Sequence, residues 1–294
     1  MKKIIFKGCG TAIATPFDEQ GVNLQEFAKL VEEQIKNEVD SIIVCGTTGE
    51  AATMTEEERL KTIECAVRIS NGRVPIVAGT GSNNTKAVIE INKKVQKIGV
   101  DGVLVVTPYY NKTTQNGLII HYTEIAKNTT LPIILYNVPG RTGVNIKPET
   151  ALELSKIENI VAIKEASGDL SQIAKIINLC KDNLNIYSGN DDQIIPILSL
   201  GGIGVISVLS NVKPKYTHDM CYSFFNKETE KAAKMQIDAI PLINALFSEV
   251  NPIPVKEALN IMGYDYGEPR LPLTKLTEKN REKLIQEMKK FGVI

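Results

Sequence analysis

"VAIKEASGD", Val161 to Asp169, is an apolar run that carries one lysine, Lys164, and ends in a Ser-Gly turn. Near-continuous apolar runs without polar alternation are typical of parallel strands that are covered on both faces. Similar runs recur along the chain, and together they predict eight strands. The predicted strands are GTAIATP (10–16), SIIVCG (41–46), PIVAG (75–79), GVLVVTP (102–108), PIILYN (132–137), IVAIKE (160–165), NIYSG (185–189) and GVISV (204–208).

Segments with helical periodicity separate these runs. One follows a polar cap at Asn23, one opens at Thr55 with acidic residues in its first turn, and one has Pro148 near its start. Strand–helix units in unbroken succession, without a linker, predict an α/β fold of the (β/α)8 TIM-barrel type. We expect residues 1–225 to form the catalytic barrel and residues 226–294 to add a C-terminal helical extension of about three helices.

An open, doubly wound sheet is the alternative arrangement of the same elements. It is disfavoured because the first strand-to-helix turn has no GxGxxG pattern. The polar residues at the strand ends are also spread over many strands, whereas a doubly wound sheet gathers them at one switch point.

The charge balance excludes a general attraction to polyanions. Lys and Arg number 34, and Asp and Glu number 34, so the formal net charge is zero and neither nucleic acid nor an anionic membrane is expected as a partner. The start, MKKIIFKGCG, lacks the apolar core of a signal peptide, and no later apolar run is long enough to span a bilayer. We therefore expect a cytoplasmic protein.

The cysteines and histidines do not form a recognisable metal or redox pattern. The five cysteines are scattered and include no CxxC pair, so we interpret them as buried apolar residues rather than disulfide, zinc or redox groups. The two histidines, His121 and His218, both fall on predicted helices. A histidine triad or a His-rich metal site is therefore not expected, and we interpret both residues as structural or surface groups.

Lys164 is the most informative residue at the predicted strand ends, where the active site of such a barrel lies. Side chains alternate along a strand, so Lys164 shares a face with Ala162 and the opposite face carries Ile163 and Glu165. A lysine that faces a poorly solvated barrel mouth is neutral more often than one in water and can attack a carbonyl group to form a Schiff base. The alternative is a structural lysine that pairs with Glu165.

Other strand ends supply hydroxyl, phenol and guanidinium groups. In GTTGE (46–50), Thr47 and Thr48 lie between two glycines, an arrangement that suits an anion nest or, alternatively, a tight turn; no lysine follows to make it a P-loop. Tyrosines at 109, 110 and 136 can transfer protons or simply pack. Arg141 can bind a carboxylate through two parallel hydrogen bonds, or form a surface salt bridge. In GTGSNNT, Asn83 or Asn84 is expected to cap a helix.

GTTGE, PYYN, YNVPGRTG, IKEASG and GVISV, in this order and spacing, resemble the dihydrodipicolinate synthase family of class I pyruvate-dependent aldolases. The resemblance covers essentially the whole chain. N-acetylneuraminate lyases and keto-sugar-acid aldolases of the same superfamily share the Schiff-base lysine and the tyrosine. The threonine pair in GTTGE and Arg141 in its context favour the synthases.

The resemblance implies a lyase with 4-hydroxy-tetrahydrodipicolinate synthase activity, which opens the diaminopimelate branch of lysine biosynthesis. Lys164 would form an imine with pyruvate, and the resulting enamine would attack aspartate semialdehyde. Tyr136, Thr47 and Tyr110 would form a proton relay, with Tyr110 reaching in from a neighbouring subunit. The implied assembly is a homotetramer built as a dimer of tight dimers.

Substrate binding is implied for four further residues. Thr48 and the backbone at Ile206 would hold the pyruvate carboxylate, and Arg141 would orient the relay and the semialdehyde carboxylate. Gly189 would shape the pocket floor. No metal and no organic cofactor are implied, since the lysine itself provides the electron sink.

One departure from the family concerns feedback inhibition by lysine. Inhibited members use a serine directly after GTTGE, two histidines in the next helix and a glutamate in the helix after the third strand. The corresponding positions here are Ala51, Glu56, Arg59 and Ala87, while Asn83 and Tyr109 remain. An ammonium that loses its polar partners in a buried site is bound poorly, so we expect weak or absent inhibition by lysine.

Two other functions remain open from the sequence. A sialic-acid or keto-sugar-acid lyase would use the same Lys164. A catalytically silent barrel that binds a small acid would retain the fold without forming an imine.

Overall fold

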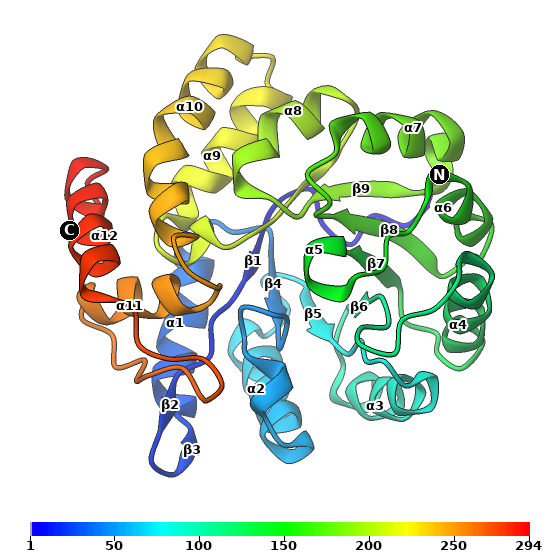
Figure 1. The fold of residues 1–294 in the computed structure, drawn as a ribbon, viewed down its shortest axis with the longest axis horizontal. Helices are drawn as coiled ribbons and strands as arrows, with labels where there is room; N and C mark the ends of the chain where they lie inside the picture. The colour runs from blue at the N-terminus through cyan, green and yellow to red at the C-terminus, as the bar shows by residue number, and fades with distance from the viewer. Residues whose placement is uncertain (1) are drawn as a thin grey trace.

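Eight parallel strands close into a barrel in the computed structural model, which describes residues 2–294 (Figure 1). Around the barrel the strand order is β1-β10-β9-β8-β7-β6-β5-β4. The strands are β1 Gly8–Ala12, β4 Ser41–Val44, β5 Ile76–Gly79, β6 Gly102–Val106, β7 Ile133–Asn137, β8 Ile160–Glu165, β9 Asn185–Ser188 and β10 Gly204–Ser207. A separate hairpin joins β2 (Phe17–Asp18) to β3 (Gly21–Val22). The predicted TIM-barrel fold is confirmed.

Helices alternate with the strands and surround the barrel. The α-helices of the barrel are α1 Leu24–Lys36, α2 Glu56–Ser70, α3 Thr85–Ile98, α4 Gln115–Lys127, α5 Pro139–Thr142, α6 Pro148–Ser155, α7 Leu170–Cys180, α8 Ile194–Ser199 and α9 Pro214–Phe225. Short 3-10 turns lie at η1 Ala51–Thr53, η2 Lys181–Asn183, η3 Asp191–Gln193 and η4 Leu209–Asn211. Three further helices follow: α10 Thr229–Leu246, α11 Ile253–Ile261 and α12 Glu278–Lys290.

Three of the predicted helix starts carry side-chain caps, whereas α6 begins at Pro148 without one. Asn23 Oδ1 accepts from the Glu26 amide at 3.1 Å, and Thr55 forms a reciprocal capping box with Glu58. Of the two candidate caps before α3, Asn84 is the one used: its Oδ1 accepts from the amides of Lys86 and Ala87.

The first strand was predicted at 10–16, but it spans Gly8–Ala12. Its pairing with β10 starts at Gly8 and Gly204, where a Cβ on Gly204 would lie 2.2 Å from the Gly8 carbonyl oxygen. Glycine at position 204 therefore allows a close approach of the two strand backbones, although glycine is unfavourable in strands by propensity. After Ala12 the backbone leaves the sheet, since the Ala14 amide donates to the Asn211 side chain at 3.0 Å.

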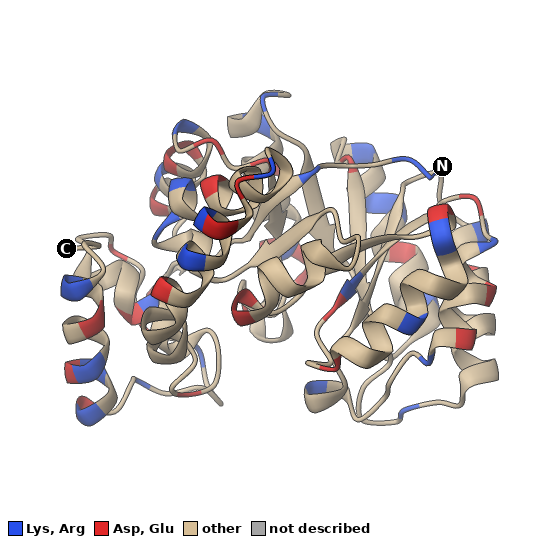
Figure 2. Ribbon diagram, turned by 90° about the horizontal axis from the view of Figure 1, so that it is seen from above, with Lys and Arg blue, Asp and Glu red and all other residues tan. Residues whose placement is uncertain are grey.

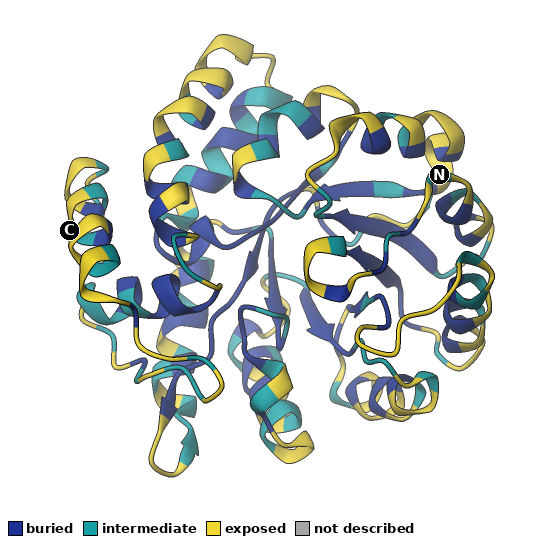
Figure 3. Ribbon diagram, viewed as in Figure 1, coloured by how far each residue is buried: buried dark blue, intermediate teal, exposed yellow. Residues whose placement is uncertain are grey.

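The apolar residues form two clusters, one inside the barrel and one between the strands and the helices. The barrel strands are buried along nearly their whole length, whereas the surrounding helices bury one face (Figure 3). The larger cluster runs without interruption from the barrel into α10 and α11 through residues such as Leu242 and Val255. The division of the chain near residue 225 stays a prediction, because the two parts share this core.

The surface carries both signs of charge, interspersed over the outer helices (Figure 2), as the zero net charge predicts. Among residues 2–294, no helix combines the length and apolar character needed to cross a membrane. All five cysteines are buried and unpaired, which confirms the prediction that they are buried residues.

Both histidines lie on helices and bind neighbouring side chains. His121 on α4 shares a hydrogen bond of 2.9 Å with Thr85 Oγ1, and His218 on α9 lies 3.0 Å from Asp40 Oδ2. Burial lowers the pKa of His121 from 6.5 to about 4. His121 is therefore neutral in the folded chain at a pH where it is protonated in the unfolded chain.

This difference predicts an acid-dependent loss of stability. Below pH 6.5 the unfolded chain binds a proton at His121 that the folded chain does not, so the free energy of unfolding falls as the pH drops toward 4. Between about pH 7.5 and about pH 5, His121 should account for a loss of about 2 kcal/mol. In urea unfolding, His121→Asn should lose about that much less than the parent chain over this range. Equal losses in both proteins would contradict the assignment.

Candidate active site

Lys164 on β8 faces the inside of the barrel near its carboxyl end. Ala162, two residues earlier, belongs to the interior cluster, and Lys164 itself is 6% exposed. In the strand register Lys164 lies between Tyr136 of β7 and Tyr187 of β9. Its Nζ lies 4.4 Å from the centroid of the Tyr136 ring. The predicted orientation into the barrel is therefore correct.

Glu165 lies on the opposite face of β8 and uses its oxygens on neutral donors. Asn137 Nδ2 donates to both carboxylate oxygens at 3.0 Å, and the Ser167 amide and Gln172 Nε2 donate at 2.8 and 3.2 Å. The alternative in which Lys164 pairs with Glu165 is therefore wrong. Burial raises the pKa of Glu165, and these donors oppose the rise.

The Glu165 contacts also fix the two catalytic candidates relative to each other. Asn137 and Glu165 are register partners on β7 and β8, directly after the partners Tyr136 and Lys164. Bonds between the outward-facing pair therefore hold the inward-facing pair at a set separation.

The GTTGE segment forms the turn between β4 and η1, with Thr47 half-buried and Thr48 buried. Thr48 Oγ1 accepts from Asn251 Nδ2 at 3.0 Å, and the Gly49 carbonyl accepts from Thr15 Oγ1 at 2.9 Å. Because the oxygen of Thr48 already accepts a hydrogen bond, its hydroxyl hydrogen is left to donate to a bound acceptor.

Arg141, in the short helix α5, is exposed, and its Nη2 donates to the Asn251 carbonyl at 3.3 Å. Its observed partner is therefore a backbone oxygen rather than the carboxylate of a surface salt bridge. Asn251 thus contacts both Thr48 and Arg141, and so joins two of the predicted binding residues. Sequence reasoning missed Asn251, because it lies in a region that was interpreted only as a helical extension.

The backbone at two neighbouring strand ends completes the rim. Ile206 is buried within β10 and belongs to the interior cluster. Gly189 follows β9, and its amide donates to the Glu165 carbonyl at 2.7 Å. A Cβ at Gly189 would lie 2.5 Å from the Ala166 side chain, so only glycine lets β9 approach β8 this closely.

Tyr110 stands apart from these residues. Its side chain is 91% exposed and its backbone has φ 68°, whereas Tyr136 is buried. Tyr109, beside it, is 39% exposed. The structure of one chain therefore brings together Lys164 with Tyr136, and Thr48 with Arg141 through Asn251, but leaves Tyr110 in the solvent.

A second buried carboxylate, on Asp191, lies at the end of β9. Its Oδ2 accepts from the amides of Val208 and Leu209, each at 2.9 Å, and so fixes the chain just after β10. Burial raises the pKa of Asp191, although these hydrogen bonds and the charge of Lys164 lower it. The "SGNDD" pattern indicated polar residues at this strand end but not which one was structural.

Within residues 2–294, one group of side chains has ligand atoms close enough to hold a metal: Glu38, His218 and Asp219. Lys215 Nζ lies 3.0 Å from Glu38 Oε2 and 2.9 Å from Asp219 Oδ1. The negative charge of these carboxylates is therefore already balanced by an ammonium group. The group also lies on the loop before β4 and on α9, away from Lys164.

This arrangement is suited to covalent chemistry on a small keto acid. A buried amine lies over a phenol ring, a fixed hydroxyl can donate to a carboxylate, and a guanidinium group lies at the rim. An amine in such surroundings can form an imine with a carbonyl group, while the hydroxyl and guanidinium hold acidic groups of the substrate.

Comparison with known proteins gives a consistent result over the whole chain. The sequence model of the Dihydrodipicolinate synthetase family matches residues 5–291. A protein of Clostridium acetobutylicum named 4-hydroxy-tetrahydrodipicolinate synthase 1 is 57% identical over 290 residues, which cover 99% of both chains.

Two solved structures share both fold and sequence. The chloride-inhibited dihydrodipicolinate synthase of Acinetobacter baumannii, complexed with pyruvate, is 43% identical, with a TM-score of 0.96. The dihydrodipicolinate synthase of Cyanidioschyzon merolae with lysine bound is 40% identical, with the same TM-score. Each comparison covers 99% of this chain and all of the other.

Proposed function

This chain belongs to the dihydrodipicolinate synthetase family and is a lyase of the 4-hydroxy-tetrahydrodipicolinate synthase type, and we propose that it condenses pyruvate with aspartate 4-semialdehyde in diaminopimelate and lysine biosynthesis. The observation that carries the proposal is the buried amine of Lys164, whose Nζ lies 4.4 Å from the Tyr136 ring. The structure of the A. baumannii relative in complex with pyruvate supports pyruvate as the first substrate.

The first step forms an imine. Lys164 Nζ attacks the keto carbon of pyruvate, and the carbonyl oxygen leaves as water after accepting protons. The hydroxyl of Thr48, whose oxygen already accepts from Asn251, donates to the pyruvate carboxylate together with the backbone at Ile206. Gly189 shapes the floor of the same pocket.

The second step forms the carbon–carbon bond. Loss of a methyl proton converts the imine into an enamine, which attacks the aldehyde carbon while the aldehyde oxygen takes up a proton. Tyr136, Thr47 and Tyr110 relay these protons, and Arg141 binds the carboxylate of the semialdehyde. The amine of the semialdehyde then displaces Lys164 as the ring closes. The imine serves as the electron sink, so the reaction requires no metal or organic cofactor.

The location of the enzyme belongs to the same proposal. Five buried, unpaired cysteines suit the reducing conditions of the cytoplasm.

Borohydride trapping tests the role of Lys164. Reduction in the presence of pyruvate should fix the adduct on Lys164, and mass spectrometry of peptides should locate it there. Lys164→Ala should lose the adduct and lower kcat by about a thousandfold or more. The matched control is Lys86→Ala, which removes an exposed lysine on α3. It should keep the adduct at Lys164 and the kcat of the parent chain. An adduct elsewhere would overturn the mechanism, and its absence would favour a silent barrel that binds small acids.

A coupled assay separates the proposed synthase from a sugar-acid lyase, since both form the same imine. Pyruvate with aspartate semialdehyde should be consumed, whereas N-acetylneuraminate should not be cleaved. The reverse pattern would assign the chain to the lyases.

The proposed assembly is a homotetramer of two tight dimers. Tyr110 is almost fully exposed in one chain, as expected for a residue that completes the relay of a second copy. We place the second interface at exposed apolar residues on α7, directly after α8 and on α10, where α8 contacts both of the other helices. These residues are Leu170, Leu200 and Ile237.

Sedimentation measurements test this assembly. The parent chain should have four times the mass of the 32.3 kDa chain. Ile237→Glu, at a position 68% exposed in the single chain, should halve that mass, because a carboxylate cannot be buried there without a partner. The dimer should remain active if Tyr110 acts across the other interface. A parent chain that sediments as a monomer would contradict both the proposed tetramer and the proposed role of Tyr110 in the site of a second copy.

Weak or absent feedback by lysine is proposed from the residues at the family's inhibitor positions. Arg59 Nη2 donates to the Gly79 carbonyl at 2.9 Å, and Glu56 pairs with Lys94. A fixed guanidinium group therefore occupies a position where inhibited relatives have a histidine, and it repels a lysine ammonium.

A lysine titration of the condensation tests this proposal. The parent chain should keep most of its activity at about 1 mM lysine, a concentration that would half-saturate a site binding with about 4 kcal/mol. The quadruple variant Ala51→Ser, Glu56→His, Arg59→His, Ala87→Glu restores the inhibited pattern and should gain sensitivity. Half-inhibition of the parent chain well below 1 mM would refute the proposal.

A further inference from the structure

A buried ion pair joins the threonine turn to the C-terminal helices. Lys256 on α11 donates from Nζ to Glu50 Oε1 at 2.8 Å, and the two side chains are 0% and 1% exposed. Glu50 is the last residue of GTTGE, so the pair acts directly on the turn that carries Thr47 and Thr48.

Both members of the ion pair also form hydrogen bonds to the backbone. Glu50 Oε2 accepts from the Arg270 amide at 2.9 Å, and Lys256 Nζ donates to the Glu268 carbonyl at 3.1 Å. The Phe17 ring lies 4.3 Å from Lys256 Nζ and 4.1 Å from the Arg270 guanidinium carbon. The carboxylate of Glu50 is therefore held by α11 and by the segment that follows it.

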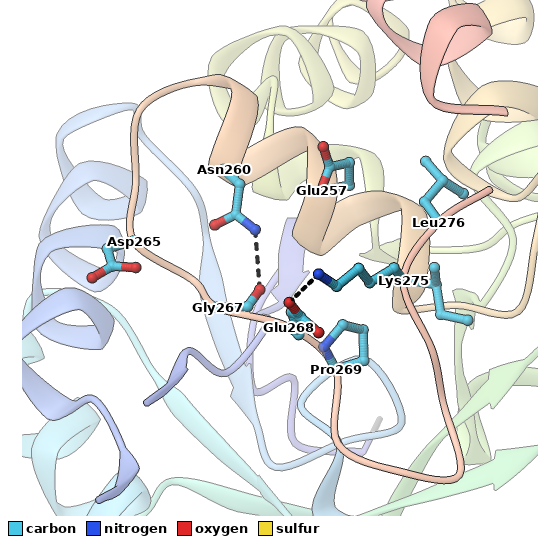
Figure 4. A pocket seen from close by; sticks show the side chains of 9 residues that line it. Glu257, Asn260, Asp265, Gly267, Glu268, Pro269, Lys275 and Leu276 are labelled. Atoms are coloured by element: carbon cyan, nitrogen blue, oxygen red, sulfur yellow. Dashed lines mark hydrogen bonds and ion pairs between the residues drawn. The ribbon is translucent and has the colours of Figure 1, made fainter. Parts of the chain in front are cut away.

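That segment is itself anchored to α11. Figure 4 shows the hydrogen bond from Asn260 Nδ2 on α11 to the Gly267 carbonyl, and the ion pair between Lys275 and Glu268 within the segment. The two N···O distances are 3.0 Å and 2.6 Å. These residues line a surface hollow of about 320 Å³. The same segment also contacts the hairpin after β1, since the Phe17 amide donates to the Tyr266 carbonyl at 3.1 Å. The groups that hold Glu50 thus form a fixed platform.

Glu50 needs such a platform because its backbone is in the left-handed region, at φ 53° and ψ 33°. This conformation is unfavourable for a residue with a Cβ and persists only where the surroundings impose it. The Glu50 amide donates to the Thr47 carbonyl at 3.1 Å, which closes the turn. The position of both threonine side chains therefore depends on the conformation of Glu50.

Stability alone does not explain two buried charges. Replacing a buried ion pair with apolar residues of similar volume is often neutral or stabilising, whereas removing one partner is strongly destabilising. Burial lowers the pKa of Lys256, and the charge of Glu50 opposes this change. The pair thus favours a specific geometry more than it favours the folded state.

We propose that Glu50 and Lys256 are positioning residues that hold Thr47 and Thr48 in their productive geometry, so that the C-terminal helical region sets the affinity for pyruvate. The inference rests on the proposed function, since it assigns the two threonines to the pyruvate and proton-relay sites. The second contact from the same region, between Asn251 and Thr48, acts in the same direction.

The experiment uses the full chain and three variants: Lys256→Met, Glu50→Gln, and the double variant that combines them. Two quantities are measured: the pyruvate concentration that half-saturates trapping at Lys164, and hydrogen exchange of the turn amides at 47–50. The melting temperature reports stability separately. Arg281→Met is the matched control, because it breaks a 2.6 Å ion pair with Glu257, the next residue on α11, without contacting the turn.

Each single variant should raise the half-saturating pyruvate concentration about tenfold, which corresponds to about 1.4 kcal/mol, and should speed exchange in the turn. The double variant should recover most of the melting temperature but keep the raised concentration and the faster exchange. Arg281→Met should leave the half-saturating pyruvate concentration and the exchange in the turn unchanged. Should the single variants fail to fold, the double variant decides the question.

A double variant that recovers pyruvate affinity together with stability would overturn the proposal, because the pair would then be merely structural. Unchanged exchange in the turn would also overturn it. If the parent chain forms no adduct at all, the proposed function fails, while the exchange measurement still tests the link between the pair and the turn.

Discussion

Closure of the strand ladder is the constraint on which the rest of the structure depends. β1 pairs with β4 on one side and with β10 on the other, so the first and last strands of the barrel meet. That contact requires glycine at position 204, where a Cβ would lie 2.2 Å from the Gly8 carbonyl oxygen. Closure places all eight carboxyl ends of the strands at one rim. Site residues as far apart in the sequence as Thr47 and Ile206 therefore lie at the same end of the barrel.

Near Lys164 the fold holds two buried carboxyl groups on amide donors. Glu165 faces away from the barrel and is held by amide donors, and Asp191 is held by two backbone amides. Both oxygens of Glu165 and the Oδ2 of Asp191 thereby have hydrogen-bond donors that carry no charge. The amine of Lys164 has the Tyr136 ring as its neighbour, 4.4 Å from Nζ to the ring centroid, and the strand register between β7 and β8 sets this position.

Local sequence signals predicted much of this structure, and non-local contacts account for the rest. Apolar runs gave the strands, side-chain alternation placed Lys164 inside, and caps at Asn23 and Thr55 gave helix starts. The start of the first strand was predicted two residues too late. The propensity of glycine is low in strands, and it contains no information on the pairing of Gly8 with β10. The contacts of Asn251 with the rim could not be predicted, since no periodicity relates residues 203 apart; the chemical roles assigned to the site residues stay predictions.

The ion pair between Glu50 and Lys256 joins residues 206 apart in the chain. During synthesis on a ribosome, the turn that bears Thr47 and Thr48 emerges long before the lysine that anchors it. A nascent chain that has already completed its eight barrel strands still lacks this anchor. Full assembly of the rim therefore waits until translation is nearly finished, so chains terminated before Lys256 would carry Lys164 and both threonines without the ion pair that anchors the turn.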